Sequence, residues 1–323
     1  MLSTGRAITR TPSPAAHEGS GYRPGLDGLR AVAVGAVVLF HLDRLPGGNL
    51  GVDAFFVLSG WLITTWLLNE AAAADSRRID LRAFWGARVR RLLPASLAVI
   101  GLVSLVWSFG DIDVPSLQRD SLWALAWASN WGTITSGGDY WARFGEASPV
   151  VHFWSLAIEE QFYIAWPIAV ALLARSSRRH LHRRVGLVAA VVAAASVAWM
   201  VAAFDAADPT ATYVHTFARV HSLLIGALAA ALTVSAGGAM RRAAARRAVG
   251  AATAAAIVMV LVSSERSVWL FQWGFPVFAI AMVVVVVAVA DGAGARVLAS
   301  SALRWIGQRS YGIYLWHWPV MVL

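Results

Sequence analysis

Two polar side chains, Arg30 and His41, flank an apolar stretch near the start of this 323-residue sequence. The ten residues between them are nine small or aliphatic residues and one Phe. On an α-helix eleven residues make about three turns, so both side chains face the same way, roughly 16 Å apart along the axis. A guanidinium can bind anionic oxygens, and an imidazole, with an ordinary pKa of about 6.5, can transfer a proton near neutral pH. The pair therefore indicates either a polar path through a helical bundle or two anchors flanking a short membrane span.

Two acidic residues lie where they could pair with this first stretch. Asp27 and Arg30 are spaced i, i+3, so an ion pair between them would lower the cost of placing Arg30 at a membrane edge. Asp53 begins the second apolar stretch, on the same side of a membrane as His41. It either orients or stabilises a His41 imidazolium or, as the spacing alone favours, interacts with the dipole of its own helix.

Arg88 and Arg91 are also spaced i, i+3, and they share one helical face at the edge of the third apolar stretch. Such a fork can hold phosphate groups through paired hydrogen bonds. The alternative is a simple anchor, because basic residues gather at the cytoplasmic ends of membrane helices.

Two further polar faces occur later in the chain. Ser155, Glu159 and Tyr163 recur at helical spacing, and a carboxylate about two turns inside a membrane helix is a functional candidate. Tyr314 and His317 form a second polar and aromatic face near the end of the sequence. Each face is either part of a binding site or a structural polar cluster between helices.

The elements that must position these side chains are membrane helices. The sequence is 58% hydrophobic and 14% charged, with a mean hydropathy of +0.61, and its apolar stretches are long enough to cross a bilayer. We therefore expect an all-α fold, a polytopic integral membrane helical bundle. The absence of cysteine excludes disulfides, thiolate metal sites and a cysteine nucleophile. We predict no metal site, and the sequence contains no nucleic-acid-binding motif.

We place nine spans, at about residues 29–43, 51–68, 93–109, 152–174, 185–204, 217–235, 248–263, 268–290 and 305–323. All 27 basic residues are arginines; twenty lie in segments that face inward if the N-terminus is cytoplasmic, and four lie in outward segments. The positive-inside rule therefore predicts a cytoplasmic N-terminus. Residues 1–21 are polar and lack the apolar core of a secretory signal, so we expect a disordered cytoplasmic tail before a single transmembrane domain over residues 22–323.

The largest outward segment, residues 110–151, is rich in tryptophan. Trp123, Trp127, Trp131 and Trp141 fit an interfacial aromatic belt, and the alternative is a lid with aromatic faces for a sugar. The sequence stops within or just after the ninth span without a polar tail. We therefore expect it to be truncated.

Five groups of residues, taken in order along the chain, form a recognisable set. They are Arg30-x10-His41; Gly51-Val52-Asp53-x-Phe55-Phe56-Val57-Leu58-Ser59-Gly60; Arg88-x-x-Arg91; Ser155-x-x-x-Glu159-x-Gln161-Phe162-Tyr163; and Ser310-Tyr311-Gly312-Ile313-Tyr314-Leu315-Trp316-His317. From about residue 22 to 319, the sequence resembles the acyltransferase-3 family of bacterial membrane acyltransferases. Members of that family typically have ten or more spans, so the resemblance implies that a tenth span is missing here.

The resemblance implies an enzyme that acylates, usually acetylates, a hydroxyl of a carbohydrate, a cell-envelope glycan or a glycosylated small molecule. It also implies a multi-pass location in the bacterial plasma (inner) membrane. The implied donor is cytoplasmic acyl-coenzyme A (acyl-CoA), with acetyl-CoA expected. In a mechanism that fits the residues, Arg88, Arg91 and Arg30 meet the phosphates of the donor, where guanidinium geometry matches phosphate oxygens.

In the same mechanism His41 is the general base or, alternatively, carries the acyl group, and Glu159 or Asp53 holds its imidazole in the required tautomer. The side chains of Ser155, Tyr163, Tyr314 and His317 are then expected to contact the substrates. The alternative function is a multi-span transporter or flippase of a lipid or sugar, which needs no acyl donor. The expected partners are the lipid bilayer, acyl-CoA and a hydroxyl acceptor, without nucleic acid, and no oligomeric state is predicted.

Overall fold

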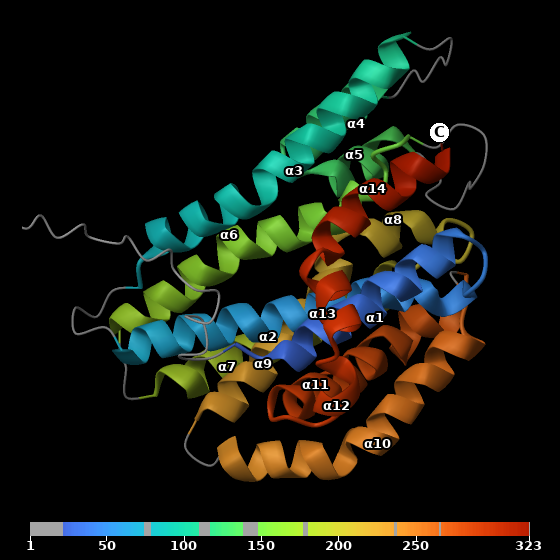
Figure 1. Cartoon of the computed structure of the whole chain (residues 1–323). Helices are drawn as coiled ribbons and strands as arrows, with labels where there is room; N and C mark the ends of the chain where they lie inside the picture. Colours follow the sequence, from blue (N-terminus) through green and yellow to red (C-terminus); the bar gives the residue numbers. More distant parts are fainter. Residues whose placement is uncertain are drawn as a thin grey trace, which may run out of the picture.

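The computed structural model describes residues 22–73, 79–109, 117–137, 148–176, 180–235, 238–264 and 266–322, and these form a bundle of helices (Figure 1). In chain order the elements are α1 (Pro24–His41), η2 (Pro46–Asn49), α2 (Leu50–Ala73), α3 (Leu81–Phe109), α4 (Leu117–Leu125), α5 (Ser129–Ser136), α6 (Phe153–Ser176), α7 (Leu181–Ala203), α8 (Pro209–Val214), α9 (Thr216–Val234), α10 (Gly238–Val262), η3 (Leu270–Gly274), α11 (Phe275–Ala290), α12 (Ala295–Leu298), α13 (Ser301–Gln308) and α14 (Ser310–Val322). The predicted all-α membrane bundle is confirmed. The predicted tail, residues 1–21, lies outside the described residues.

Eight helical segments of the described chain are long and apolar enough to cross a membrane: Pro24–His41, Pro46–Ala73, Leu81–Val106, Phe153–Ser176, Leu181–Ala203, Pro209–Val234, Gly238–Val262 and Leu270–Ala290. These correspond to the first eight predicted spans. The ninth, at 305–323, is divided between α13 and α14. Arg309 is the C-cap of α13, and its backbone N–H bonds to the carbonyls of Ile306 and Gly307. The polar run from Gln308 to Ser310 therefore separates two short helices.

The third span begins earlier than the sequence pattern predicted. Its apolar stretch starts at about residue 93, but α3 begins at Leu81 and continues through Pro94. Neighbouring groups can compensate a proline inside a membrane helix. As a result, Arg88 and Arg91 lie about two turns inside a continuous helix rather than at its edge.

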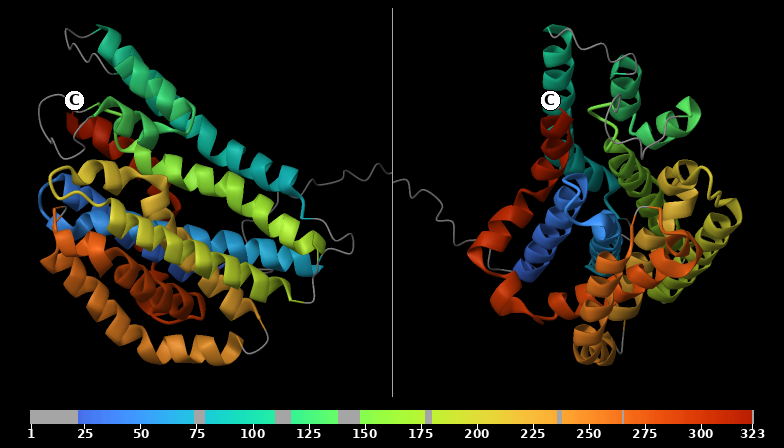
Figure 2. Two further views of the ribbon diagram at one scale, coloured as in Figure 1. Left: turned by 180° about the vertical axis from the view of Figure 1, so that it is seen from behind. Right: turned by 90° about the vertical axis from the view of Figure 1, so that its right-hand side faces the viewer.

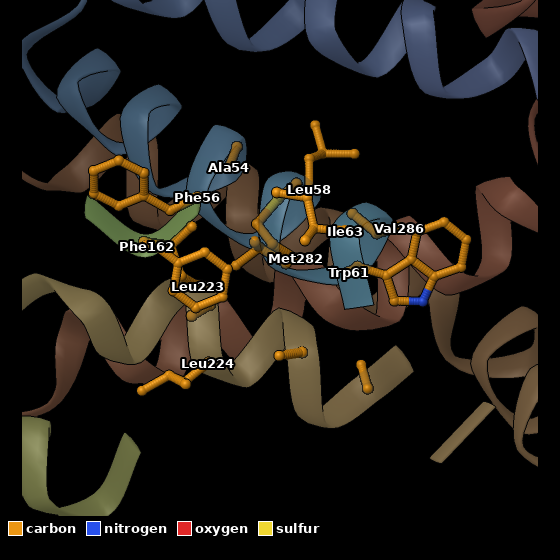
Figure 3. Packing of buried hydrophobic residues seen from close by; sticks show 14 of the residues in the cluster. Ala54, Phe56, Leu58, Trp61, Ile63, Phe162, Leu223, Leu224, Met282 and Val286 are labelled. Carbon is orange, nitrogen blue, oxygen red and sulfur yellow. The ribbon is translucent and has the colours of Figure 1, made fainter. Parts of the chain in front are cut away.

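The core of the bundle is formed by α2, α9 and α11. Figure 3 shows part of this buried cluster, with Leu58 and Ile63 of α2, Leu223 of α9 and Met282 of α11 among its labelled side chains. Close approach of α2 and α9 depends on glycine: a Cβ on Gly60 would lie 1.8 Å from the Leu223 carbonyl oxygen. Small residues of this kind allow membrane helices to pack at short backbone separation.

The helices α3 and α10 lie on opposite edges of the bundle, as the two views in Figure 2 and the view in Figure 1 agree. Both expose leucine and other aliphatic side chains, such as Leu105 and Leu261, as expected for surfaces that face lipid. The first half of α3 is fixed to α6, because Trp85 Nε1 donates a hydrogen bond to the Tyr163 carbonyl over 2.9 Å. This contact positions the two arginines of α3.

Candidate active site

A pocket of about 860 Å³, here called the main pocket, lies between α1, α2, α3, α6 and α14. It collects seven of the ten predicted site residues, namely Arg30, Arg88, Arg91, Ser155, Glu159, Tyr163 and Tyr314. The remaining wall is formed by Val52, Phe55, Phe56, Ser59, Leu62, Ile63, Leu92, Leu156, Glu160, Ser310 and Tyr311. The five groups of residues that are far apart in the sequence therefore meet around one cavity.

At one end of the pocket Arg30 forms the ion pair predicted from its spacing. Its Nη1 lies 3.0 Å from Asp27 Oδ1, and the Tyr22 hydroxyl donates to Asp27 Oδ2 over 2.7 Å. Partial burial and the bond to Asp27 raise the pKa of the Tyr22 phenol, so its hydroxyl stays protonated and donates. The Asp27 carboxylate is thus held by Tyr22 through one oxygen and orients Arg30 through the other.

The guanidinium groups of Arg88 and Arg91 have no carboxylate within ion-pair distance among the described residues. Arg88 instead lies over the ring of Tyr163, with its Cζ 4.0 Å from the ring centroid. Its buried Nε has no hydrogen-bond partner in the part of the chain that the structure describes. Because an unpaired buried donor is costly, this geometry favours an anionic ligand at this end of the pocket.

Two consecutive carboxylates of α6 line the middle of the pocket. Glu159 is held in place, because Ser59 Oγ donates to its Oε1 over 2.7 Å and the Tyr163 hydroxyl donates to Ser59 Oγ over 3.0 Å. Glu160 lines the same pocket. The hydrogen bond to Ser59 fixes Glu159 in the pocket wall, and the role of Glu159 in holding the His41 imidazole stays a prediction.

At the opposite end, the hydroxyls of Ser155 and Tyr314 lie 2.6 Å apart. The Tyr314 hydroxyl also approaches the backbone carbonyl of His152 at 3.1 Å. Both side chains line the pocket and join α6 to α14. Since the Tyr314 hydroxyl donates its proton to the His152 carbonyl, Ser155 Oγ is the donor in the bond to Tyr314, and the two hydroxyls fix α6 against α14.

His41 lies beside His317 rather than on the pocket wall. His41 Nδ1 contacts the Val37 carbonyl at 3.0 Å and His317 Nε2 at 3.2 Å. Since a carbonyl only accepts, His41 carries its proton on Nδ1; His317 Nδ1 likewise donates to the Tyr314 carbonyl. His317 Nε2 therefore accepts the hydrogen bond from His41 Nδ1. The basic lone pair of His41 is then on its own Nε2. The ring of His317 lies 5.3 Å from that of Tyr314, which connects the histidines to the pocket.

The prediction that Asp53 orients His41 requires correction. Asp53 Oδ2 lies 2.6 Å from Arg219 Nη2, and Ser222 Oγ donates to Asp53 Oδ1 over 2.9 Å. The side chains of Asp53 and Arg219 are both 0% exposed. A fully buried carboxylate takes the nearest buried cation, and the sequence offers no local signal that Arg219, 166 residues away, would supply it.

Sequence reasoning missed Ser59, Glu160 and Tyr311 as pocket residues. Ser59 and Tyr311 are polar residues in apolar helices within the matching groups, which was the available signal. Glu160 is not on the helical face shared by Ser155 and Glu159, so helical spacing gave no signal for it. Over the described ranges, His, Asp and Glu side chains do not gather in any group of three or more that could hold a metal ion.

Comparison with known proteins identifies the family of this chain. A family described as an acyltransferase domain matches residues 23–323. The O-acetyltransferase OatA of Staphylococcus aureus is 34% identical over 316 residues, which cover 93% of this chain and 51% of OatA. The putative peptidoglycan O-acetyltransferase YrhL of Bacillus subtilis is 37% identical over 315 residues, covering 94% of this chain and 49% of YrhL. The chain thus spans about half the length of these curated relatives, and no solved structure matches it. It belongs to the acyltransferase-3 family.

Proposed function

We propose that this domain transfers an acetyl group from acetyl-CoA to a hydroxyl of a cell-envelope glycan. The observation that carries the proposal is one pocket with unpaired guanidinium groups at one end and hydroxyl groups at the other, next to which the imidazoles of His41 and His317 lie in contact with each other. Such a pocket suits a donor with an anionic end and a reactive thioester end. The names of the relatives, which are O-acetyltransferases, support acetyl transfer to oxygen.

The donor enters, in this proposal, from the cytoplasm. The excess of arginine in alternate loops supports a cytoplasmic N-terminus and hence a cytoplasmic location for the start of α1 and α3. Arg88 and Arg91 would bind the phosphates of the donor, together with Arg30. The thin pantetheine arm would extend through the pocket toward Ser155 and Tyr314.

His41 acts as the general base. Its Nε2 takes the proton of the acceptor hydroxyl while the oxygen attacks the thioester carbonyl carbon, and the carbon–sulfur bond breaks to release the coenzyme A thiolate, which then takes up a proton. His317 accepts the hydrogen bond of His41 Nδ1 and so fixes the tautomer that the base needs. The bonded hydroxyls of Ser155 and Tyr314 hold α6 against α14 and so fix the pocket wall next to which the transfer takes place.

Glu159 acts from the pocket wall. Its bond with Ser59 fixes the carboxylate near the guanidinium of Arg88, where it limits how far the donor can shift. Tyr163, which supports both Ser59 and Arg88, holds these groups in one arrangement. These contacts support a positioning role for Glu159 in the transfer.

The test is acetyl transfer in membranes that contain the wild-type protein or His41→Ala, with radiolabelled acetyl-CoA and native envelope glycan. A positioned base contributes about 10² to 10⁴ in rate, so His41→Ala is expected to lose label in the glycan and coenzyme A release by at least 10²-fold. The exposed histidine variant His180→Ala is the matched control and should retain both. Full activity of His41→Ala would overturn the mechanism. Absence of glycan-dependent coenzyme A release by wild type would favour a transporter.

The donor assignment has its own test. Replacing Arg88 and Arg91 together by Ala removes two charge-assisted contacts, each contributing about 1.5–3 kcal/mol, so the KM for acetyl-CoA should rise by roughly 10²-fold or more. The KM for the glycan should stay unchanged. Arg296→Ala, at an exposed position, is the control. If the KM for the glycan rises instead, the arginines belong to the acceptor site.

A further inference from the structure

A second pocket lies at the edge of the bundle opposite α3 and takes no part in the proposed transfer. This arginine pocket has a volume of about 800 Å³ and is open to the surroundings. It is formed where the start of α10 packs against the end of α11. None of its residues lines the main pocket, so the charge gathered here needs an explanation of its own. The lining residues are Ala239, Arg242, Ala243, Arg246, Arg247 and Asp291.

Three guanidinium groups of the arginine pocket face a single carboxylate among the described residues. Asp291 Oδ1 lies 3.6 Å from Arg242 Nε, and its Oδ2 lies 3.6 Å from Arg246 Nη1. Charge-assisted hydrogen bonds are about 2.7–2.9 Å long, so both arginines keep donors for another anion. Arg247 has no carboxylate within ion-pair distance in the part of the chain that the structure describes. The pocket therefore carries an excess of positive charge.

A fourth arginine adds to this excess from the start of α1. Burial and the repulsion by Arg242 lower the pKa of Arg23, and Asp291 opposes this shift. A guanidinium group keeps its proton in proteins, so loss of a proton does not relieve the repulsion. An anion bound between these side chains would relieve it, because it would supply the negative charge that Asp291 alone does not provide.

The position of α10 indicates which kind of anion reaches the arginine pocket. Figures 1 and 2 show α10 along the outer edge of the bundle. Beyond its arginines the same helix exposes aliphatic side chains, among them Ile257, Val258 and Leu261, as on surfaces that face acyl chains. One helix therefore presents guanidinium groups at its start and a hydrocarbon surface toward its end. This order matches a phospholipid, in which a charged headgroup is joined to apolar chains.

The alternative is that these arginines only follow the positive-inside rule. That rule requires basic residues on one side of the membrane, but it does not require them to line one pocket. Arg242 is also held in place, because its Nη1 donates a hydrogen bond to the Thr233 carbonyl over 2.8 Å while its Nε faces Asp291. A guanidinium group that is fixed before binding loses less conformational freedom when an anion binds. The geometry therefore favours a specific site over a general anchor.

We propose that the arginine pocket binds the phosphate group of an anionic phospholipid of the surrounding bilayer. Arg246 and Arg247 contact the phosphate oxygens, to which guanidinium geometry is matched, and Arg242 adds its charge from the pocket wall. The acyl chains lie along the exposed face of α10. The site is on the same side of the membrane as the start of α1, because Arg23 interacts with Arg242 and Asp291. This inference is independent of the proposed function.

The test measures the Kd of phosphatidylglycerol for the purified chain in detergent, from the rise in unfolding temperature with lipid concentration. An arginine near an anionic lipid contributes about fivefold to affinity, so Arg246→Gln combined with Arg247→Gln should raise the Kd about 25-fold. Asp291→Asn removes the opposing charge and should lower the Kd about fivefold by the same argument. The matched control combines Arg175→Gln with Arg183→Gln, at exposed positions outside the pocket, and should change the Kd less than twofold.

Three outcomes would overturn the inference. Equal rises in the Kd for the two double variants would mean that the lipid responds only to the total charge of the protein. Equal affinity for zwitterionic phosphatidylcholine, which should bind wild type at least tenfold more weakly, would mean that only the acyl chains bind. If inorganic phosphate alone stabilises wild type as phosphatidylglycerol does, the ligand is a soluble phosphate and not a lipid. An unchanged unfolding temperature without added lipid shows that each variant is folded.

Discussion

The ion pair between Asp53 and Arg219 allows structural and catalytic roles to be separated by experiment. It joins α2 to α9 in the core, where both side chains are fully buried. Arg219 lies over the ring of Phe275, with its Cζ 3.8 Å from the ring centroid. Its Nε and Nη1 have no hydrogen-bond partner in the described part of the chain. We therefore predict that the pair affects the stability of the fold because its two charges balance each other, and not because its hydrogen bonds are complete.

The size of the effect follows from burial. Removing one member of a buried pair leaves an uncompensated charge and costs about 3–5 kcal/mol, or roughly 10² to 10⁴ in the folding equilibrium. Asp53→Asn keeps the shape of the side chain and removes only its charge, so it should lower the free energy of unfolding by that amount. Replacing both residues, as Asp53→Leu with Arg219→Met, removes both charges. Such replacements are often neutral or stabilising, so the double variant should recover most of the loss.

The assay combines stability with activity. Unfolding of the detergent-solubilised protein is followed by the fluorescence of its 16 tryptophans, and acetyl transfer is measured in membranes. A structural role predicts that the double variant is stable and retains the kcat of wild type. If the double variant is stable but its kcat falls as far as that of His41→Ala, Asp53 acts in catalysis and the interpretation is refuted. Equal stability of Asp53→Asn and wild type would refute the charge argument.

Two further predictions follow from the geometry. His317→Leu should lower kcat by about 10²-fold at unchanged KM values, because misplacing a catalytic group by about 1 Å costs that much. The side-chain oxygen of His317→Gln can accept from His41 Nδ1, so this variant should keep much of the wild-type kcat. Equal kcat values for the two variants would exclude the hydrogen bond as the cause. Gly60→Ala should lower the free energy of unfolding by about 1–3 kcal/mol, because its Cβ would lie 1.8 Å from the Leu223 oxygen. Gly35→Ala, whose Cβ would have no atom within 4 Å, should not destabilise the protein. Comparable losses for the two variants in fluorescence-monitored unfolding would show that the close approach is unimportant.

Helical periodicity was sufficient to predict which polar residues share a face. The pair Asp27 and Arg30 forms the ion pair expected from i, i+3 spacing, and Ser155, Glu159 and Tyr163 line one pocket as their spacing indicated. These predictions succeeded because the period of an α-helix fixes direction around its axis without reference to other helices. The eight spans were found for a related reason, since a bilayer requires a long apolar segment whatever its neighbours are.

Helical periodicity could not predict which side chains contact each other between helices. The sequence pattern placed Asp53 near His41 by membrane side alone, but Arg219 competes for the same carboxylate from α9. The hydrogen bond between His41 and His317 joins residues 276 positions apart, and no local pattern specifies it. Partner choice between helices depends on the burial and packing of both side chains, so it becomes visible only in the folded bundle.

The adjacent carboxylates of α6 differ in their contacts. Consecutive residues on an α-helix point about 100° apart, yet Glu159 and Glu160 both line the main pocket. Glu159 accepts a hydrogen bond from Ser59, whereas no side chain of the described residues donates one to Glu160. In a transfer reaction the donor and acceptor must meet and yet be bound separately. If the two carboxylates contact different substrates, Glu159→Gln and Glu160→Gln should change different kinetic constants, measured as the KM for acetyl-CoA, the KM for the glycan and kcat. An identical kinetic defect in both variants would mean that the two carboxylates serve a single site.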